Sequence, residues 1–163
     1  DAEASGRKTV VTNKLRIDPA GFRRDRFRFF TPTPTRWGDC DMFGHINNVQ
    51  FVRYYESGRI DYFHRLLDLK SGPEVNNSLI IADIHVTFLR QIHHPGDLQV
   101  GSRISRLGNS SFDFEAAIFL ANEDEPCSLS IATCVWFNFQ DNHGTPIPAA
   151  QRETIKQFEG IES

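Results

Sequence analysis

Residues 47–69 predict a helix that needs other parts of the protein on several of its sides. The apolar side chains recur at helical spacing but cover more than one stripe; they are Phe51, Val52, Tyr54, Tyr55, Ile60, Tyr62, Phe63, Leu66 and Leu67. Gly58 lies in the middle of the segment and costs about 1 kcal/mol of helix propensity relative to alanine. Its presence indicates that another backbone approaches the helix closely at this point.

From residue 78 onward the apolar residues alternate, which is typical of β-strands. Four alternating segments are separated by turn residues: 78–92, 98–108, 112–120 and 128–140. In the first segment, one face is predicted to carry Ile80, Ala82, Ile84, Val86 and Phe88. The second and third segments are predicted to direct Leu98, Val100, Ile104, Phe112, Phe114, Ala116, Ile118 and Leu120 to the core.

An edge strand and a short final helix complete the predicted elements. Residues 25–37 alternate, but Pro32 and Pro34 lack the amide donors that an inner strand needs. Residues 149–160 have a helical pattern that ends at a glycine. Strands grouped after one long helix favour the α+β class. A single curved antiparallel sheet wrapped around that helix would satisfy its apolar sides.

Length and composition fit one folded domain preceded by a basic arm. The chain has 163 residues, of which 39% are hydrophobic and 24% are charged, enough for a core without disulfides or metals. Residues 1–28 hold eight Lys or Arg against four acids, whereas the rest of the chain holds ten against seventeen. An acidic folded body argues against nucleic-acid binding. We expect a solvated arm over residues 1–24 and a single domain over residues 25–163.

The cysteines and the lengths of the apolar segments indicate the cellular compartment of the protein. No window is long and apolar enough to span a membrane, and no apolar segment typical of a secretory signal occurs near the start. The cysteines are Cys40, Cys127 and Cys134, an odd number without metal-ligand spacing. We therefore expect reduced thiols and a cytoplasmic location.

The most polar stretch of the chain, GDCDMFGHINN, leads directly into the predicted helix. One interpretation is structural, with Asn47 or Asn48 as the helix cap, Gly44 as the bend, and Asp39 and Asp41 as turn carboxylates. The other interpretation is chemical. Free amides at a helix N-terminus carry about half a positive charge and suit a developing oxyanion, while a nearby carboxylate can act as base or nucleophile. Together these groups predict a site that attacks a carbonyl.

Signatures of other enzyme classes are absent from the sequence. It has no G-x-S-x-G elbow of the α/β serine hydrolases, no G-x-G-x-x-G motif and no P-loop. His93 and His94 are adjacent and would point to opposite sides of a strand, so we expect no metal site. A thiolate pair of Cys40 with His45 is disfavoured, because Cys40 lies between two carboxylates that oppose the thiolate.

The segment RWGDCDMFGHINNVQFVRYYESGRIDYF resembles the signature of the 4-hydroxybenzoyl-CoA thioesterase branch of the hot-dog superfamily, D-x-D-x-x-G-H-x-N-N followed by a long helix. Further similar segments extend the resemblance over about residues 27–158. It implies the hot-dog fold, in which a five-stranded antiparallel sheet wraps around one long helix. It also implies a homodimer joined through sheet edges, with active sites between subunits, and in many relatives a tetramer of two such dimers.

The resemblance also implies roles for single residues. Asp41 matches the catalytic carboxylate, the amide of Asn48 matches the group that polarises the thioester carbonyl, and His45 completes the catalytic candidates. The candidate substrate-binding residues are Gly44, Asn47, Phe51, Tyr55 and Arg90. Phe51 and Tyr55 are expected in the acyl pocket, and Arg90, like Arg59, near the phosphates of coenzyme A. Glu56 is interpreted as a surface or inter-subunit contact.

The function implied is hydrolysis of an acyl- or aryl-CoA thioester to the free acid and coenzyme A, with Asp41 as base or nucleophile. Coenzyme A belongs to the substrate, and no cofactor is expected. Two alternatives remain open. A hot-dog dehydratase acting on hydroxyacyl thioesters would need a histidine base such as His45, and a non-catalytic acyl-CoA-binding protein would not need Asp41.

Overall fold

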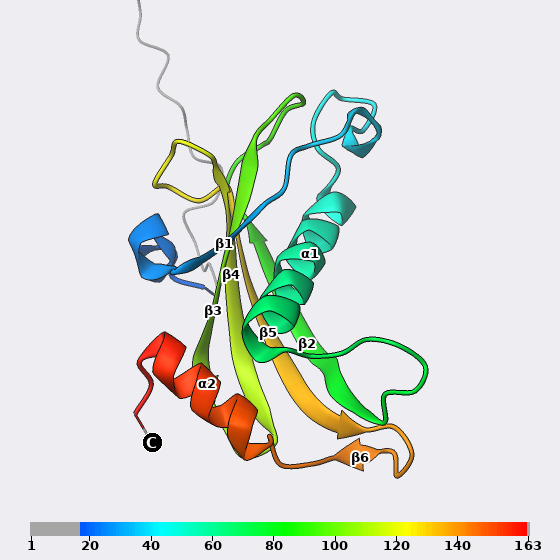
Figure 1. Cartoon of the computed structure of the whole chain (residues 1–163). Coiled ribbons are helices and arrows are strands. Elements are labelled where there is room, and N and C mark those ends of the chain that lie inside the picture. The colour runs from blue at the N-terminus through cyan, green and yellow to red at the C-terminus, as the bar shows by residue number, and fades with distance from the viewer. Residues whose placement is uncertain (1–16, 163) are drawn as a thin grey trace, which may run out of the picture.

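The computed structural model describes residues 17–162, which form one curved antiparallel sheet with helix α1 against it (Figure 1). The strands are β1 (Phe29–Pro32), β2 (Asn77–Phe88), β3 (Leu98–Leu107), β4 (Ser111–Leu120), β5 (Ser128–Asn138) and β6 (His143–Gly144). The helices are α1 (Asn48–Leu67) and α2 (Ala149–Glu159), with short 3-10 helices at Pro19–Phe22, Arg24–Arg26 and Trp37–Asp39. The strand order is β1-β3-β4-β5-β2, and β6 adds two residues beside β5. The predicted α+β hot-dog fold is confirmed, including the edge position of β1.

The main core lies between α1 and the concave face of the sheet. The predicted inward residues of β3 and β4 are confirmed, because Leu98, Val100, Ile104, Phe112, Phe114, Ala116 and Ile118 are at most 2% exposed. The neighbour indicated by Gly58 is β3. A Cβ atom at Gly58 would lie 2.6 Å from Cγ1 of Val100 and 3.3 Å from Oγ of Ser102. Because Gly58 has no side chain, α1 can pack closely against β3.

The predicted inward face of β2 is wrong at two of its five residues. Pairing between β2 and β5 changes register between Ile81 and Asp83, and such a bulge moves side chains to the other face. Ile81 pairs with Cys134, which belongs to the core. The concave face of β2 therefore carries Leu79, Ile81, Ile84, Val86 and Phe88, without the predicted Ile80 and Ala82.

The N-terminal segment packs on the convex face of the sheet. Ile17, Phe22 and Phe27 are at most 5% exposed and contact apolar side chains of β4 and β5. The expectation of a solvated arm therefore does not hold for residues 17–24. The remainder of that predicted arm, residues 1–16, lies outside the described residues.

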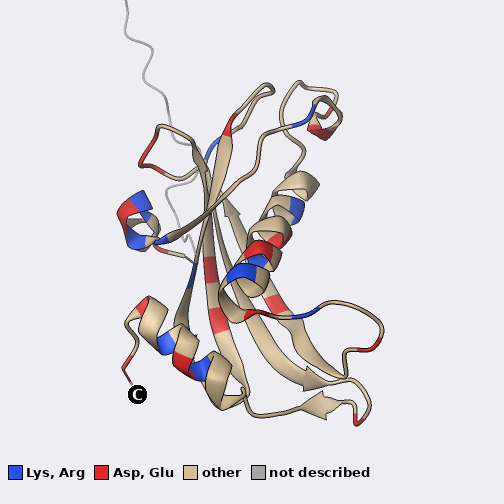
Figure 2. Ribbon diagram, in the orientation of Figure 1, with Lys and Arg blue, Asp and Glu red and all other residues tan. Residues whose placement is uncertain are grey.

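Acidic and basic residues are interspersed along α1 and α2 (Figure 2). The cations of these helices do not gather into one basic stripe of the kind that nucleic-acid binding favours. Of the helices in the described part of the chain, none is both long and apolar enough to cross a membrane.

Candidate active site

The polar turn before α1 closes on itself. The Asp41 amide donates to the His45 carbonyl at 2.8 Å, and the Gly44 amide donates to the Asp41 carbonyl at 3.1 Å. Gly44 has φ of 77°, a left-handed conformation that glycine adopts without steric cost. A β-bridge between Cys40 and Ile46 closes the base of the turn. Backbone hydrogen bonds therefore hold Asp41 and His45 opposite one another.

The carboxylate of Asp41 has one engaged and one open oxygen. Its Oδ1 accepts hydrogen bonds from the amides of Phe43 at 2.8 Å and His45 at 3.3 Å. Its Oδ2 has no hydrogen-bond partner within residues 17–162. The side chain is half-buried. One oxygen thus stabilises the turn while the other can meet a ligand or a water molecule.

The first amide of α1 is also open. Asn47 is the N-cap, and its side chain accepts a hydrogen bond from the Val49 amide at 3.1 Å. The Asn48 amide, one residue earlier in the helix, has no acceptor among the described residues. A helix N-terminus concentrates partial positive charge on such amides. The Asn48 N–H can therefore donate to a carbonyl oxygen placed at the helix mouth.

A cleft of about 280 Å³ lies at this mouth, where the end of β2 and the residues after it pass α1. Its lining consists of His45, Ile46, Asn48, Phe51, Phe88, Leu89, Arg90 and Gln91. The rings of Phe51 and Phe88 meet edge to face, with centroids 5.1 Å apart. The sequence pattern placed Phe88 on a strand but did not identify it as a site residue, because its position depends on how β2 passes the helix.

Four of the predicted site residues line this cleft, and the other four do not. His45, Asn48, Phe51 and Arg90 line it, whereas Asp41, Gly44, Asn47 and Tyr55 are not part of the lining. Asp41 is joined to the lining residue His45 by the hydrogen bonds of the turn. Gly44 and Asn47 have the bend and cap positions that the structural interpretation gave them.

Tyr55 and Arg90 have surroundings different from those expected. Tyr55 is 1% exposed within the core, and burial raises the pKa of its hydroxyl. Arg90 forms an ion pair with Glu123 and donates to the Glu125 carbonyl at 2.9 Å. Partial burial opposes its charge, but Glu123 and Cys127 together outweigh this effect and raise the pKa of Arg90. Arg90 would therefore have to exchange partners before binding a phosphate.

The other aspartate of the turn anchors the turn to α1. Asp39 is 8% exposed, and its Oδ2 accepts hydrogen bonds from the Tyr54 hydroxyl at 2.6 Å and the Arg36 amide at 2.8 Å. Burial, followed by the hydrogen bond and the charge of Asp39, raises the pKa of Tyr54. No short sequence motif indicates this pair, because its members lie fifteen residues apart.

The histidines around the turn contact one another without forming a metal centre. The rings of His45 and His93 have centroids 4.9 Å apart, and Nδ1 of His93 lies 3.3 Å from the Gly44 carbonyl oxygen. Within residues 17–162, no three or more His, Cys, Asp or Glu side chains are grouped as metal ligands would be. The chemistry available at the mouth is thus that of a carboxylate, an amide and an imidazole.

Residues 35–155, which include the turn, α1 and the cleft, match the thioesterase-like superfamily. The uncharacterised protein YsmA of Bacillus subtilis is 28% identical over 131 residues, which are 79% of this chain and 86% of YsmA. An acyl-acyl carrier protein thioesterase of the Arabidopsis thaliana chloroplast is 25% identical over 74% of this chain and 64% of its own length. A Thermus thermophilus thioesterase solved with coenzyme A and zinc has a TM-score of 0.71 and 29% identity, over 85% of this chain and 99% of that chain.

Proposed function

The chain belongs to the thioesterase-like superfamily, and we propose that it hydrolyses acyl- or aryl-CoA thioesters to the free acid and coenzyme A. The proposal rests on the helix mouth. Among residues 17–162, the Asn48 amide there has no acceptor and one carboxylate oxygen of Asp41 has no donor. An aromatic-walled cleft lies alongside. The Thermus relative that was solved with coenzyme A supports coenzyme A as the thiol carried by the substrate.

The proposed reaction begins with the thioester carbonyl at the mouth of α1. The Asn48 amide donates to the carbonyl oxygen and stabilises the negative charge that develops there. The open oxygen of Asp41 either attacks the acyl carbon, giving a mixed anhydride that water then hydrolyses, or takes a proton from a water that attacks directly. His45 lines the cleft and is proposed to contact the reacting group.

The departing thiol needs little help from an acid. Coenzyme A leaves as a thiolate when the carbon–sulfur bond breaks, and thiols ionise with a pKa of roughly 8.5. The hydroxyl of the water ends on the acyl carbon, and its proton ends on the thiolate. One carboxylate and one amide donor are therefore sufficient for the proposed hydrolysis, and no cofactor is required.

We further propose that the cleft is completed by a second copy of the chain. β2 lies at the edge of the sheet, and its apolar residues Ile81, Ile84 and Phe88 are 36–49% exposed. Long apolar edges favour pairing with another strand and are normally covered. A homodimer joined through β2 would cover these side chains and add a wall beside Phe88. Tetramers would then form from two such dimers.

The test uses a panel of acetyl-, hexanoyl-, decanoyl-, palmitoyl- and benzoyl-CoA. A disulfide reagent that reacts with the free thiol of coenzyme A measures the rate of hydrolysis of each. The proposed function predicts thiol release together with the free acid for at least one of them. Decanoyl-acyl carrier protein is included because the Arabidopsis relative is named for such substrates. Faster hydrolysis of the carrier-protein substrate would reject coenzyme A as the preferred carrier.

Two other outcomes would contradict the proposal. Loss of water from a 3-hydroxyacyl-CoA without thiol release would identify a dehydratase. Tight binding of acyl-CoA with neither reaction would identify a binding protein.

A further inference from the structure

Helix α1 leaves one side of the concave face uncovered. It packs closely on β1, β3 and β4, and β2 is not among the strands it contacts closely. Apolar side chains on the concave face of β2 are consequently exposed, including Ile84 at 38%. Along α1, Asn48, Val52, Glu56 and Arg59 follow helical spacing and share one side. This side of the helix and β2 form the two walls of an open region.

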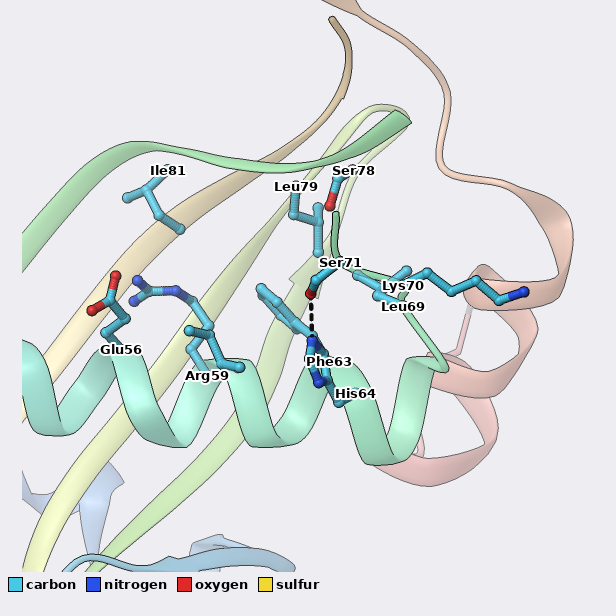
Figure 3. Close-up of a pocket in the computed structure, with 11 residues that line it drawn as sticks. Glu56, Arg59, Phe63, His64, Leu69, Lys70, Ser71, Ser78, Leu79 and Ile81 are labelled. Carbon is cyan, nitrogen blue, oxygen red and sulfur yellow. Dashed lines mark hydrogen bonds between the residues drawn. The ribbon is translucent and has the colours of Figure 1, made fainter. Parts of the chain in front are cut away.

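A hollow lies at each end of this region. The first is the cleft at the helix mouth, with Asn48, Phe51 and Phe88 in its lining. The second is a cavity of about 270 Å³ between the later turns of α1 and the start of β2 (Figure 3). Its walls include the apolar side chains of Phe63 and Leu79. An acyl chain that starts at the mouth and follows α1 would therefore end in the second cavity.

Arg59 lines this second cavity and differs from other half-buried arginines in its hydrogen bonds and ion pairs. It is half-buried, yet within residues 17–162 it has neither an ion pair nor a hydrogen bond. Burial lowers the pKa of Arg59. Other half-buried arginines are bonded, as Arg103 is to Glu115 and Arg152 to the Gly108 carbonyl. Among the described residues, Cys134 and Glu56 favour the charge of Arg59 but form no hydrogen bond with it. A partly desolvated guanidinium without a hydrogen-bond acceptor is unfavourable unless another group supplies one.

The direction of Arg59 indicates where that group would come from. The guanidinium extends along α1 toward Glu56, which is the direction of the helix mouth (Figure 3). Lys70 also lines the cavity, but its ammonium group points away from the other lining residues (Figure 3). Glu56 adds one negative charge beside Arg59, and His64 is hydrogen-bonded to Ser71 at 2.8 Å. The cation that faces this cavity is thus Arg59, whose guanidinium fork suits a carboxylate.

We propose that Arg59 selects acyl groups that end in a carboxylate, that is, coenzyme A thioesters of dicarboxylic acids. This proposal rests on the proposed thioesterase function. Because the Arg59 guanidinium extends back along α1 to the level of Glu56 (Figure 3), the acyl chain has to reach from Asn48 to Glu56. This separation of eight residues spans roughly 12 Å at the helical rise of about 1.5 Å per residue. An extended chain of about eight to ten carbons covers this length. The free carboxylate then receives the Arg59 hydrogen bonds while the thioester carbonyl remains at the Asn48 amide.

The experiment compares two substrates of equal length, sebacoyl-CoA with a free terminal carboxylate and decanoyl-CoA without one. The wild-type protein should have a kcat/KM roughly tenfold or more higher for sebacoyl-CoA, as expected for a charge-assisted bidentate pair. Arg59→Met should reduce the ratio of kcat/KM for sebacoyl-CoA to kcat/KM for decanoyl-CoA to about one. Arg53→Met, which changes an exposed arginine of the same helix, is the matched control and should keep the preference.

A binding measurement makes the result independent of turnover. Calorimetric titration of the Asp41→Asn protein with both thioesters should show tighter binding of sebacoyl-CoA, and adding Arg59→Met should abolish the difference. Arg59→Lys keeps the charge but loses the guanidinium fork, so it should retain part of the difference in affinity between the two thioesters. It replaces Arg59→Met in the experiment if Arg59→Met does not fold. If the protein hydrolyses decanoyl-CoA and sebacoyl-CoA equally well and the Arg59 variants do not change the two rates, the inference about Arg59 is overturned but the thioesterase function stands. Selective binding without any hydrolysis would instead reject the thioesterase function and keep the selectivity of Arg59.

Discussion

Asp39 and Asp41 lie two residues apart in surroundings that suit different tasks. Asp39 is almost enclosed and accepts hydrogen bonds from the Tyr54 hydroxyl and a backbone amide. Asp41 is half-buried, and one of its oxygens has no hydrogen-bond donor in the described part of the chain. The sequence indicates both as turn carboxylates, and the resemblance to the hot-dog family singled out Asp41. The Asp39–Tyr54 bond could not be predicted, because it depends on how the turn packs against the second turn of α1.

Replacing the partner of Asp39 tests this division. Tyr54→Phe would leave the enclosed carboxylate without its hydroxyl donor, and hydrogen bonds to charged groups contribute about 1.5–3 kcal/mol. We expect the free energy of unfolding in urea to fall by about that amount. Unchanged stability would show that the Asp39 carboxylate gains nothing from Tyr54.

At the scale of elements, periodicity predicted both helices to within two residues. It also predicted the order along the chain of β1, α1, the four long strands and α2. It failed where a local irregularity or a distant partner decides the outcome. The bulge between Ile81 and Asp83 changes the face of β2, and a bulge has no period to detect. The segment with Ile17 and Phe22 was predicted to be part of a solvated basic arm because its apolar residues lack a repeat. Its burial depends on the convex face of β4 and β5.

Gly58 offers a direct test of how α1 packs on β3. In Gly58→Ala the new methyl group would clash with Val100. Overpacking costs about 1–3 kcal/mol and the gain in helix propensity returns about 1 kcal/mol. We expect a net loss of up to about 2 kcal/mol in the free energy of unfolding.

The same substitution in a Val100→Ala background supplies the control for Gly58. With the opposing methyl groups removed, Gly58→Ala should become neutral or stabilising, so that the two changes are coupled. Equal losses in both backgrounds would show that Val100 does not set the separation of helix and sheet.

At the scale of the whole molecule, the off-centre position of α1 and the free edge of β2 are two aspects of one arrangement. The helix satisfies its apolar sides against β1, β3, β4 and α2, leaving β2 with exposed apolar side chains. The sequence predicted a wrapped helix but not which strand would be left uncovered. The proposed dimer and the proposed acyl path both use this uncovered side.

The dimer can be tested at β2. Light scattering of the wild-type protein should give twice the 18.6 kDa of one chain, or four times if two dimers associate. Ile84→Lys places a charge on the exposed edge strand, and lysine on an edge opposes strand pairing. This variant should have the light-scattering mass of a monomer and an unchanged circular dichroism spectrum. A monomeric wild-type protein, or an Ile84→Lys protein of unchanged mass, would contradict pairing through β2.

The central claim is that Asp41 drives hydrolysis at the helix mouth, and the turnover of Asp41→Asn tests it most directly. Asparagine keeps an oxygen that can accept the Phe43 and His45 hydrogen bonds, so the turn is retained and only the charged oxygen is lost. On the best acyl-CoA of the panel, we predict that kcat falls by about a hundredfold or more, with Asp141→Asn in an exposed loop as the matched control at wild-type activity. Near wild-type turnover of a correctly folded Asp41→Asn protein would contradict the account.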